Sequence, residues 1–137
     1  MEITVREFRS EDTKDAIAIW NEVVDQGKAF PQLEDLGVED GEAFFKEQSY
    51  TGIAVNENDE IVGLYILHPN NIGRCGHICN ASYAVKSTVR GQGVVKSNTT
   101  ALKLYQKLGF TQLGTIPGGF LNKDGVYEDI IVHYKEL

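Results

Sequence analysis

The chain has 137 residues, a length typical of one domain, and 42% of them are hydrophobic and 24% charged, as in ordinary globular proteins. Its net charge of -7 argues against binding to nucleic acids or anionic membranes, because both need basic patches. No apolar run approaches the about 18 residues of a membrane span, and the N-terminus lacks a signal-peptide pattern, so we expect a cytoplasmic protein.

The first half of the chain predicts a strand, two helices and a hairpin, over residues 3–8, 9–27, 38–49 and 51–69. Ser10 is the expected N-cap of the first helix, and Gly27 is its expected end. Phe44 and Phe45 should lie on the buried side of the second helix. A polar turn over residues 56–59 joins the two apolar runs of the hairpin.

The second half predicts a strand, a helix and two further strands, over residues 77–85, 98–110, 110–116 and 126–137. The loops between them cover residues 68–76 and 117–125, where glycine and asparagine are frequent. No internal repeat or linker interrupts this order. The pattern therefore indicates one α/β or α+β domain.

Two cysteines, Cys75 and Cys79, flank His77. A zinc site needs about four ligands in recognised pairs, and the sequence has no second cluster of cysteine and histidine to complete one. We expect two reduced thiols in or beside a strand and no bound metal. A zinc-binding regulatory domain that uses these three residues is the competing hypothesis.

The Gly-rich stretch Arg90-Gly91-Gln92-Gly93 follows the predicted strand over residues 77–85. Glycines let the backbone come close to an anion, and successive N–H groups can point at a phosphate. Two glycines alone can also form an ordinary turn, so this stretch by itself is weak support for a phosphate site.

The neighbouring residues make the pattern specific. "YAVKSTVRGQGV" followed by "NTTALKLYQKLGF" resembles the GNAT N-acetyltransferase superfamily, which binds acetyl-CoA. Arg90, Gly93 and Val94 fit the phosphate pattern of that family. A second family signature matches Asn98, Ala101, Leu104, Tyr105, Gly109 and Phe110. The resemblance covers essentially the whole chain and implies a twisted mixed β-sheet flanked by helices on both faces.

One departure from the family lies directly after the Gly-rich stretch. Val95 stands where the family has Gly or Ala, and the helix and parallel strand that should follow are absent. Two parallel strands need a crossover of about a dozen residues or more. A helix, a strand and short loops amount to roughly 20–30 residues. We expect the natural protein to contain this segment between Val94 and Val95; a genuine deletion is the alternative, and it would impair the CoA site.

The resemblance assigns roles to several residues. It implies that Tyr105 is the general acid that protonates the CoA thiolate, whereas its helical position also fits a tyrosine packed on the core. It implies that the backbone at Val85 pairs with the pantetheine arm and that its N–H polarises the acetyl carbonyl. Asn98 either hydrogen-bonds a pantetheine amide or caps its helix. The backbone N–H groups expected at the pyrophosphate belong to Arg90, Gly91, Gln92, Gly93 and Val94.

A general base is not evident from the sequence. The candidates on predicted strands are Glu128, Asp129, His77 and Tyr83. Substrate selection in such enzymes comes from the loop between the first two helices and from the loop before the last strand. Phe30 and Phe120 lie in these loops, and they are either pocket walls or residues anchored in the core.

The sequence therefore favours an enzyme that transfers an acetyl group from acetyl-CoA to a primary amine, of a small molecule or an amino acid. The acidic composition is compatible with such a substrate. The alternative is a non-catalytic GNAT-like module that binds CoA or a partner. Homodimers are common among the proteins it resembles, but nothing in the sequence marks an interface.

Overall fold

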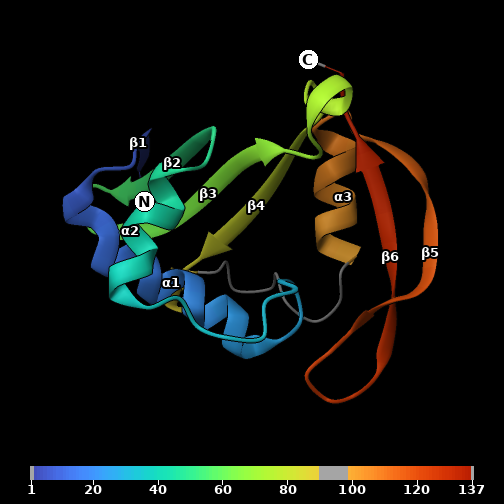
Figure 1. The fold of residues 1–137 in the computed structure, drawn as a ribbon, viewed down its shortest axis with the longest axis horizontal. Helices are drawn as coiled ribbons and strands as arrows, with labels where there is room; N and C mark the ends of the chain where they lie inside the picture. The colour runs from blue at the N-terminus through green and yellow to red at the C-terminus, as the bar shows by residue number, and fades with distance from the viewer. Residues whose placement is uncertain (1, 90–98, 137) are drawn as a thin grey trace. The chain divides into compact units, whose positions relative to one another are not determined.

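The computed structural model describes residues 2–89 and 99–136, and the chain divides into two compact units, Met1–Val89 and Arg90–Leu137. The helices and strands of both units are drawn in Figure 1. The first unit contains β1 (Ile3–Glu7), α1 (Thr13–Gln26), α2 (Val38–Lys46), β2 (Tyr50–Asn56), β3 (Ile61–Pro69) and β4 (Cys79–Val85). The second contains α3 (Thr99–Lys107), β5 (Thr111–Leu121) and β6 (Tyr127–Tyr134).

The strands of the first unit form one sheet in the order β1-β2-β3-β4, and those of the second unit form the pair β5-β6. Every strand pair within residues 2–89 and 99–136 is antiparallel. The predicted α+β class is confirmed, but a mixed sheet was expected. The parallel strand that the resemblance implies belongs to the segment that is absent from the sequence between Val94 and Val95.

The start of α1 differs from the prediction. Ser10 is not its N-cap, because a 3-10 turn over Ser10–Asp12 precedes the helix. The carboxylate of Asp12 accepts the Arg9 backbone N–H at 2.8 Å and two guanidinium N–H groups of Arg6 at 2.7 Å each. Gly27 ends the helix as predicted, with the left-handed φ of 58° that glycine adopts at little cost.

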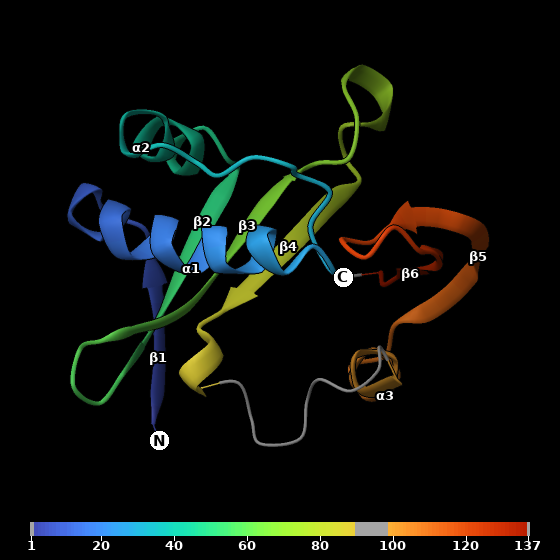
Figure 2. The ribbon, with the colours of Figure 1, turned by 90° about the horizontal axis from the view of Figure 1, so that it is seen from below.

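Both helices of the first unit pack on the same face of its sheet, and Figure 2 shows α1 crossing the strands. Trp20 is 1% exposed and lies at the centre of this core, with ring centroids 4.3 Å from Phe30 and 5.1 Å from Phe44. Phe45 is equally buried, which confirms the buried side of α2. The buried core comprises Ala16, Ile17, Ile19, Trp20, Val23, Val24, Phe30, Phe45, Ile53, Val55, Ile61, Leu64, Ile66 and Ala84.

The second unit corrects one predicted boundary. Residues 117–125 were expected to form a loop, but β5 continues through the first part of them to Leu121. The register shifts between Ile116 and Phe120, so the Pro-Gly-Gly sequence is accommodated as an irregularity inside the strand. Gly118 has φ 58° there, and its N–H donates to the Asp129 carboxylate at 2.9 Å. Phe120 therefore lies in a strand.

No helix in the part of the chain that the structure describes is long and apolar enough to cross a membrane.

Candidate functional site

The outer edge of β4 is the first element of the candidate site. β4 is the last strand in the order of its sheet. The Lys86 N–H donates to the Val62 carbonyl at 2.9 Å, and the register continues with Leu64 opposite Ala84. Because antiparallel pairs alternate, the backbone of Val85 is directed away from β3. An edge strand in this arrangement can pair with an extended ligand.

The ring of Tyr105 is held inside the second unit. It extends from α3, and its centroid lies 5.4 Å from that of Phe110 and 5.3 Å from that of His133 on β6. Both tyrosine and histidine are half-buried. The sequence analysis did not select His133 as a functional residue, because the sequence indicates only that it lies on the closing strand. The two neighbouring rings restrict the orientation of the Tyr105 phenol.

The residues predicted to bind the pyrophosphate lie outside the described residues; they are Arg90, Gly91, Gln92, Gly93 and Val94. The predicted pantetheine ligand, Asn98, also lies outside them. Their roles stay predictions.

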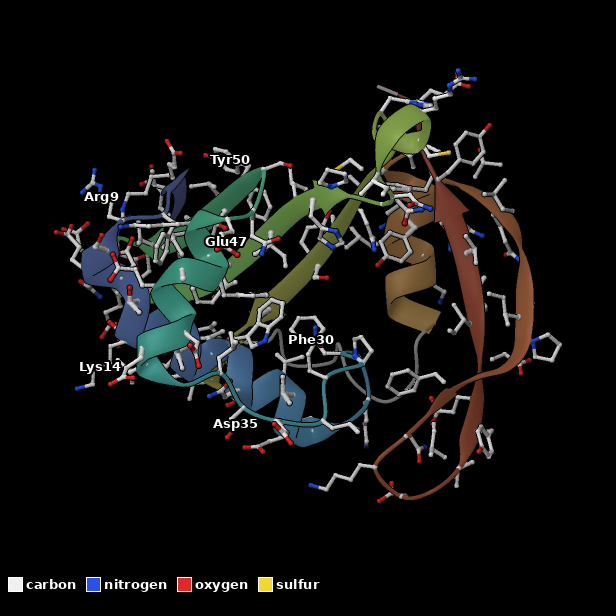
Figure 3. All side chains as sticks on the ribbon, in the orientation of Figure 1. Arg9, Lys14, Phe30, Asp35, Glu47 and Tyr50 are labelled. Carbon is white, nitrogen blue, oxygen red and sulfur yellow. The ribbon has the colours of Figure 1, made fainter. Side chains whose placement is uncertain are left out.

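The two candidate pocket phenylalanines differ in their surroundings. Phe30, labelled in Figure 3, is 7% exposed and packs against Trp20 in the core of the first unit. Phe120 is half-buried in β5, opposite Glu128. Phe30 therefore has the contacts of a core residue, which is the second of the two interpretations of the sequence.

The candidate bases are distributed over both units. Glu128 accepts a hydrogen bond from the Asn122 amide at 2.7 Å, and Asp129 accepts one from the Gly118 N–H. Both bonds lie within the hairpin that β5 and β6 form. His77 has its Nδ1 3.1 Å from the Arg74 carbonyl on the surface. No single candidate is distinguished by these contacts.

Three tyrosines form a row on the face of the first sheet opposite the helices. The centroid of Tyr65 lies 5.9 Å from that of Tyr50 and 6.1 Å from that of Tyr83. Gly52 lies against Tyr65, and a Cβ there would enter the ring. Burial, followed by the interaction with Tyr50, raises the pKa of Tyr65. A raised pKa favours the protonated phenol of Tyr65.

Cys75 and Cys79 are exposed and not disulfide-bonded. Within residues 2–89 and 99–136, no three side chains of the histidine, cysteine, aspartate or glutamate type come together to hold a metal ion.

Comparison with solved structures identifies the fold. No protein-family model matches the chain. A GCN5-related N-acetyltransferase from Kribbella flavida superimposes with a TM-score of 0.84, at 25% identity, over 98% of both chains. The chain has the GNAT fold. A phosphinothricin acetyltransferase of this superfamily from Sinorhizobium meliloti, solved in complex with acetyl-CoA, has a TM-score of 0.85 at 15% identity, over 97% of this chain and 87% of its own.

A curated relative supports the GNAT assignment at the level of sequence. The N-acetyltransferase aca1 of Schizosaccharomyces pombe is 22% identical over 108 residues, which correspond to 59% of this chain and 52% of the relative. The chain thus spans about half the length of the curated relative that it matches. Since 59% of 137 residues is well short of 108, the relative has residues within the matched region that this chain lacks.

Proposed function

We propose that this chain is an N-acetyltransferase that moves the acetyl group of acetyl-CoA to the primary amine of a small molecule or amino acid. The observation that carries the proposal is the structural likeness to the Kribbella flavida N-acetyltransferase over 98% of both chains. The Sinorhizobium meliloti structure supports acetyl-CoA as the acetyl donor, because that protein was solved with it.

The resemblance to the GNAT superfamily supports a role of β4 in holding the donor along its edge. An extended pantetheine arm would pair with this edge as a further strand does. The N–H of Val85 would then polarise the acetyl carbonyl and stabilise the negative charge that develops on its oxygen. Positioning of the thioester beside the amine supplies much of the rate enhancement in such a reaction.

The chemical step forms one bond and breaks another. The neutral amine attacks the acetyl carbon, a C–N bond forms, and the C–S bond to CoA breaks. Tyr105 donates its phenolic proton to the leaving thiolate, and the proton that the amine loses passes through water to restore the phenol. The contacts of Tyr105 with Phe110 and His133 support this role, because a general acid must be held in one orientation.

Replacement of the Tyr105 hydroxyl tests the proposal. We expect Tyr105→Phe to lower kcat for thiol release from acetyl-CoA by roughly 100-fold or more, the usual contribution of a general acid. Acetyl-CoA affinity, measured by calorimetry, should stay unchanged because the ring is retained. Tyr134→Phe, on an exposed tyrosine of β6, is the matched control. Equal kcat values in both variants would remove Tyr105 from the mechanism.

A second candidate function is a non-catalytic module that binds CoA. The sequence favours it, because only four residues separate Gly93 from Asn98, fewer than the family's helix and strand contain. Such a module would bind acetyl-CoA in calorimetry and release no thiol with any amine. An acetyltransferase would release thiol with at least one amine of a broad panel.

A further inference from the structure

The connection between β3 and β4, residues 70–78, is a loop that closes on itself outside the sheet. At its base Pro69 pairs with Cys79 in the β3–β4 register, and the Asn70 N–H donates to the Ile78 carbonyl at 2.7 Å. Figure 1 shows the loop extending beyond the ends of the two strands. Its residues are exposed, apart from the half-buried Gly76. The proposed mechanism assigns no step to this loop.

Both cysteines of the chain belong to this loop or to its base. Cys75 ends the 3-10 turn Gly73–Cys75, and Cys79 is the first residue of β4. Both are exposed and carry free thiols. A thiol that reacts with an oxidant in solution must be accessible, and both cysteines meet this condition. Since the sequence contains no third cysteine, a disulfide within the chain can only join these two.

A backbone turn holds the two cysteines near each other. The Ile78 N–H donates to the Cys75 carbonyl at 3.3 Å, which closes a turn over residues 75–78. The end residues of such a turn have Cα atoms less than about 7 Å apart, and Cys79 follows at about 3.8 Å. The Cα atoms of Cys75 and Cys79 are therefore at most about 11 Å apart. A disulfide needs about 4.4–6.8 Å, so a local movement of about 4 Å at most brings the thiols together.

The loop can make this movement without disturbing the sheet. Gly73 has φ 63°, and a Cβ added to it would meet no atom within 4 Å, which leaves room there. Gly76 follows Cys75 directly, and glycine changes its backbone angles at little steric cost. The Cys79 Sγ is only weakly engaged, as a donor to the Asn80 carbonyl at 3.5 Å. Exposed backbone hydrogen bonds such as those of this turn open at a low cost in free energy.

We propose that Cys75 and Cys79 are a redox-sensitive dithiol site, which hydrogen peroxide oxidises to a disulfide that closes the turn before β4. One thiolate attacks a peroxide oxygen, so that an S–O bond forms and the O–O bond breaks. The second thiolate then attacks the sulfur of this sulfenic acid, so that the S–S bond forms and the S–O bond breaks. Each leaving hydroxide takes up a proton released from a thiol and departs as water. The two sulfur atoms together lose two electrons, which the peroxide accepts.

The short spacing favours the disulfide within the loop over competing products. Only residues 76–78 separate the two cysteines, and the entropic cost of closing a loop falls with its length. A second thiol on the same loop acts at an effective concentration on the order of millimolar. An exposed disulfide is readily reduced again, which makes the site reversible. Two thiols that did not meet would instead react singly, with a small thiol or onward to sulfinic acid.

Mass spectrometry after mild oxidation tests the proposal. Trypsin cleaves after Arg74 and Lys86, so both cysteines lie in the peptide of residues 75–86. We would treat the reduced protein with equimolar hydrogen peroxide, block the remaining thiols with iodoacetamide and digest the product. The expected wild-type peptide has lost two hydrogen atoms and carries no alkyl group. Dithiothreitol should restore both thiols, which iodoacetamide then blocks.

The single variants Cys75→Ser and Cys79→Ser show whether the two thiols act together. In each variant the remaining cysteine should gain two oxygen atoms, as a sulfinic acid, more extensively than in the wild type, because no partner captures its sulfenic acid. Three results would overturn the proposal. They are a wild-type peptide alkylated at both cysteines, equal sulfinic acid formation in wild type and variants, and a disulfide-linked dimer as the main product.

Hydrogen exchange measures the effect of the disulfide on the loop. The Asn70 amide, whose bond to Ile78 closes the base of the loop, should exchange several-fold more slowly in the oxidised protein. The Asn56 amide, bonded to the Glu60 carbonyl at 3.0 Å in the β2–β3 turn, is the matched control and should not change. Equal exchange of the Asn70 amide in both forms would contradict closure of the turn. None of these measurements uses thiol release from acetyl-CoA, so their outcome is separate from that of the proposed function.

Discussion

At the residue scale, the Arg6–Asp12 pair connects β1 with the start of α1. The Asp12 side chain is 4% exposed and the Arg6 side chain 27%. Removal of one partner leaves the other charge poorly compensated, which costs roughly 3–5 kcal/mol in a fully buried pair. Because Arg6 is partly solvated, we expect Asp12→Asn to lower the free energy of unfolding by about 2–3 kcal/mol in urea denaturation. Glu11→Gln, in an exposed pair with Arg9, should change it by less than about 0.5 kcal/mol.

The same pair gives a pH dependence with a defined sign. Hydrogen bonds from Arg6, and then from the Arg9 backbone, hold the pKa of Asp12 below its usual value of 3.8. A carboxyl with a depressed folded pKa stabilises the fold above its unfolded pKa, and this contribution is lost as the pH falls below it. The stability difference between wild type and Asp12→Asn should be constant from about pH 5 to 8 and narrow below about pH 4. A difference that grows in acid would contradict this assignment.

The contact between His133 and Tyr105 allows a prediction that depends on the proposed role of Tyr105. We expect His133→Ala to lower kcat by about tenfold, because a loosened phenol spends less time in the productive orientation. His133→Phe keeps a ring against Tyr105 and should recover most of the activity. Thermal unfolding of both variants controls for loss of the fold. Full activity in His133→Ala would show that this contact does not position Tyr105.

At the residue scale, a feature that depends on local backbone conformation was predictable from the sequence, and contacts between distant residues were not. Gly27 was predicted because the left-handed end of a helix depends on local backbone conformation alone. Asp12 was missed as the group that organises the start of α1, because its partner Arg6 lies on the preceding strand. The contact of His133 with Tyr105 joins a strand to a helix and has no periodic signature.

At the scale of elements, α1 and α2 approach closely at Gly41. A Cβ at this position would lie 2.6 Å from Cγ1 of Ile17. Alanine favours a helix over glycine by about 1 kcal/mol, but overpacking of a core costs typically about 1–3 kcal/mol. We therefore expect Gly41→Ala to destabilise the protein by about 1 kcal/mol in urea denaturation, against the helix propensity.

A second substitution shows whether the contact is the cause. Ile17→Ala removes both Cδ1 and Cγ1, the two atoms of Ile17 that the new Cβ would meet, so it should cost less in the Gly41→Ala background than in the wild type. A double-mutant cycle should yield a coupling of about 1 kcal/mol. Gly37→Ala, whose Cβ would have only Asp40 at 3.7 Å, should show no such coupling. Additive effects at Gly41 would contradict the close approach.

The apolar pattern of the sequence was sufficient to predict some elements, but it did not predict the full length of β5. The apolar pattern of residues 9–27, and the two apolar runs joined by a polar turn in the β2–β3 hairpin, predicted their elements, because each element packs against the same core. β5 was predicted too short, since Pro117, Gly118 and Gly119 are typical of a turn. The register shift and the Gly118–Asp129 hydrogen bond allow the strand to continue. Such a tertiary compensation cannot be derived from local propensity.

At the scale of the whole molecule, the chain has the GNAT fold, but its connection between β4 and α3 is shorter than the helix and strand that the family has there. The resemblance indicated the fold through two motifs, and the comparison with the Kribbella flavida protein confirmed it. The sequence also predicts a missing segment between Val94 and Val95. The matched region of the curated yeast relative contains residues that this chain lacks, but the match does not place them in the chain, so the missing segment stays a prediction.

The intact mass of the natural protein, purified from its source, tests the missing segment directly. The 137 residues account for 15.2 kDa. We expect a mass higher by about 2–3 kDa, which corresponds to the roughly 20–30 residues of a helix, a strand and short loops. A peptide map should place the extra mass between Gly93 and Asn98.

A mass that equals 15.2 kDa would mean a genuine deletion. The backbone donors for the pyrophosphate would then lack their helix, whose N-terminus normally favours an anion. Acetyl-CoA binding should in that case be weak or absent in calorimetry, and tight binding would show that the short connection suffices to hold the donor.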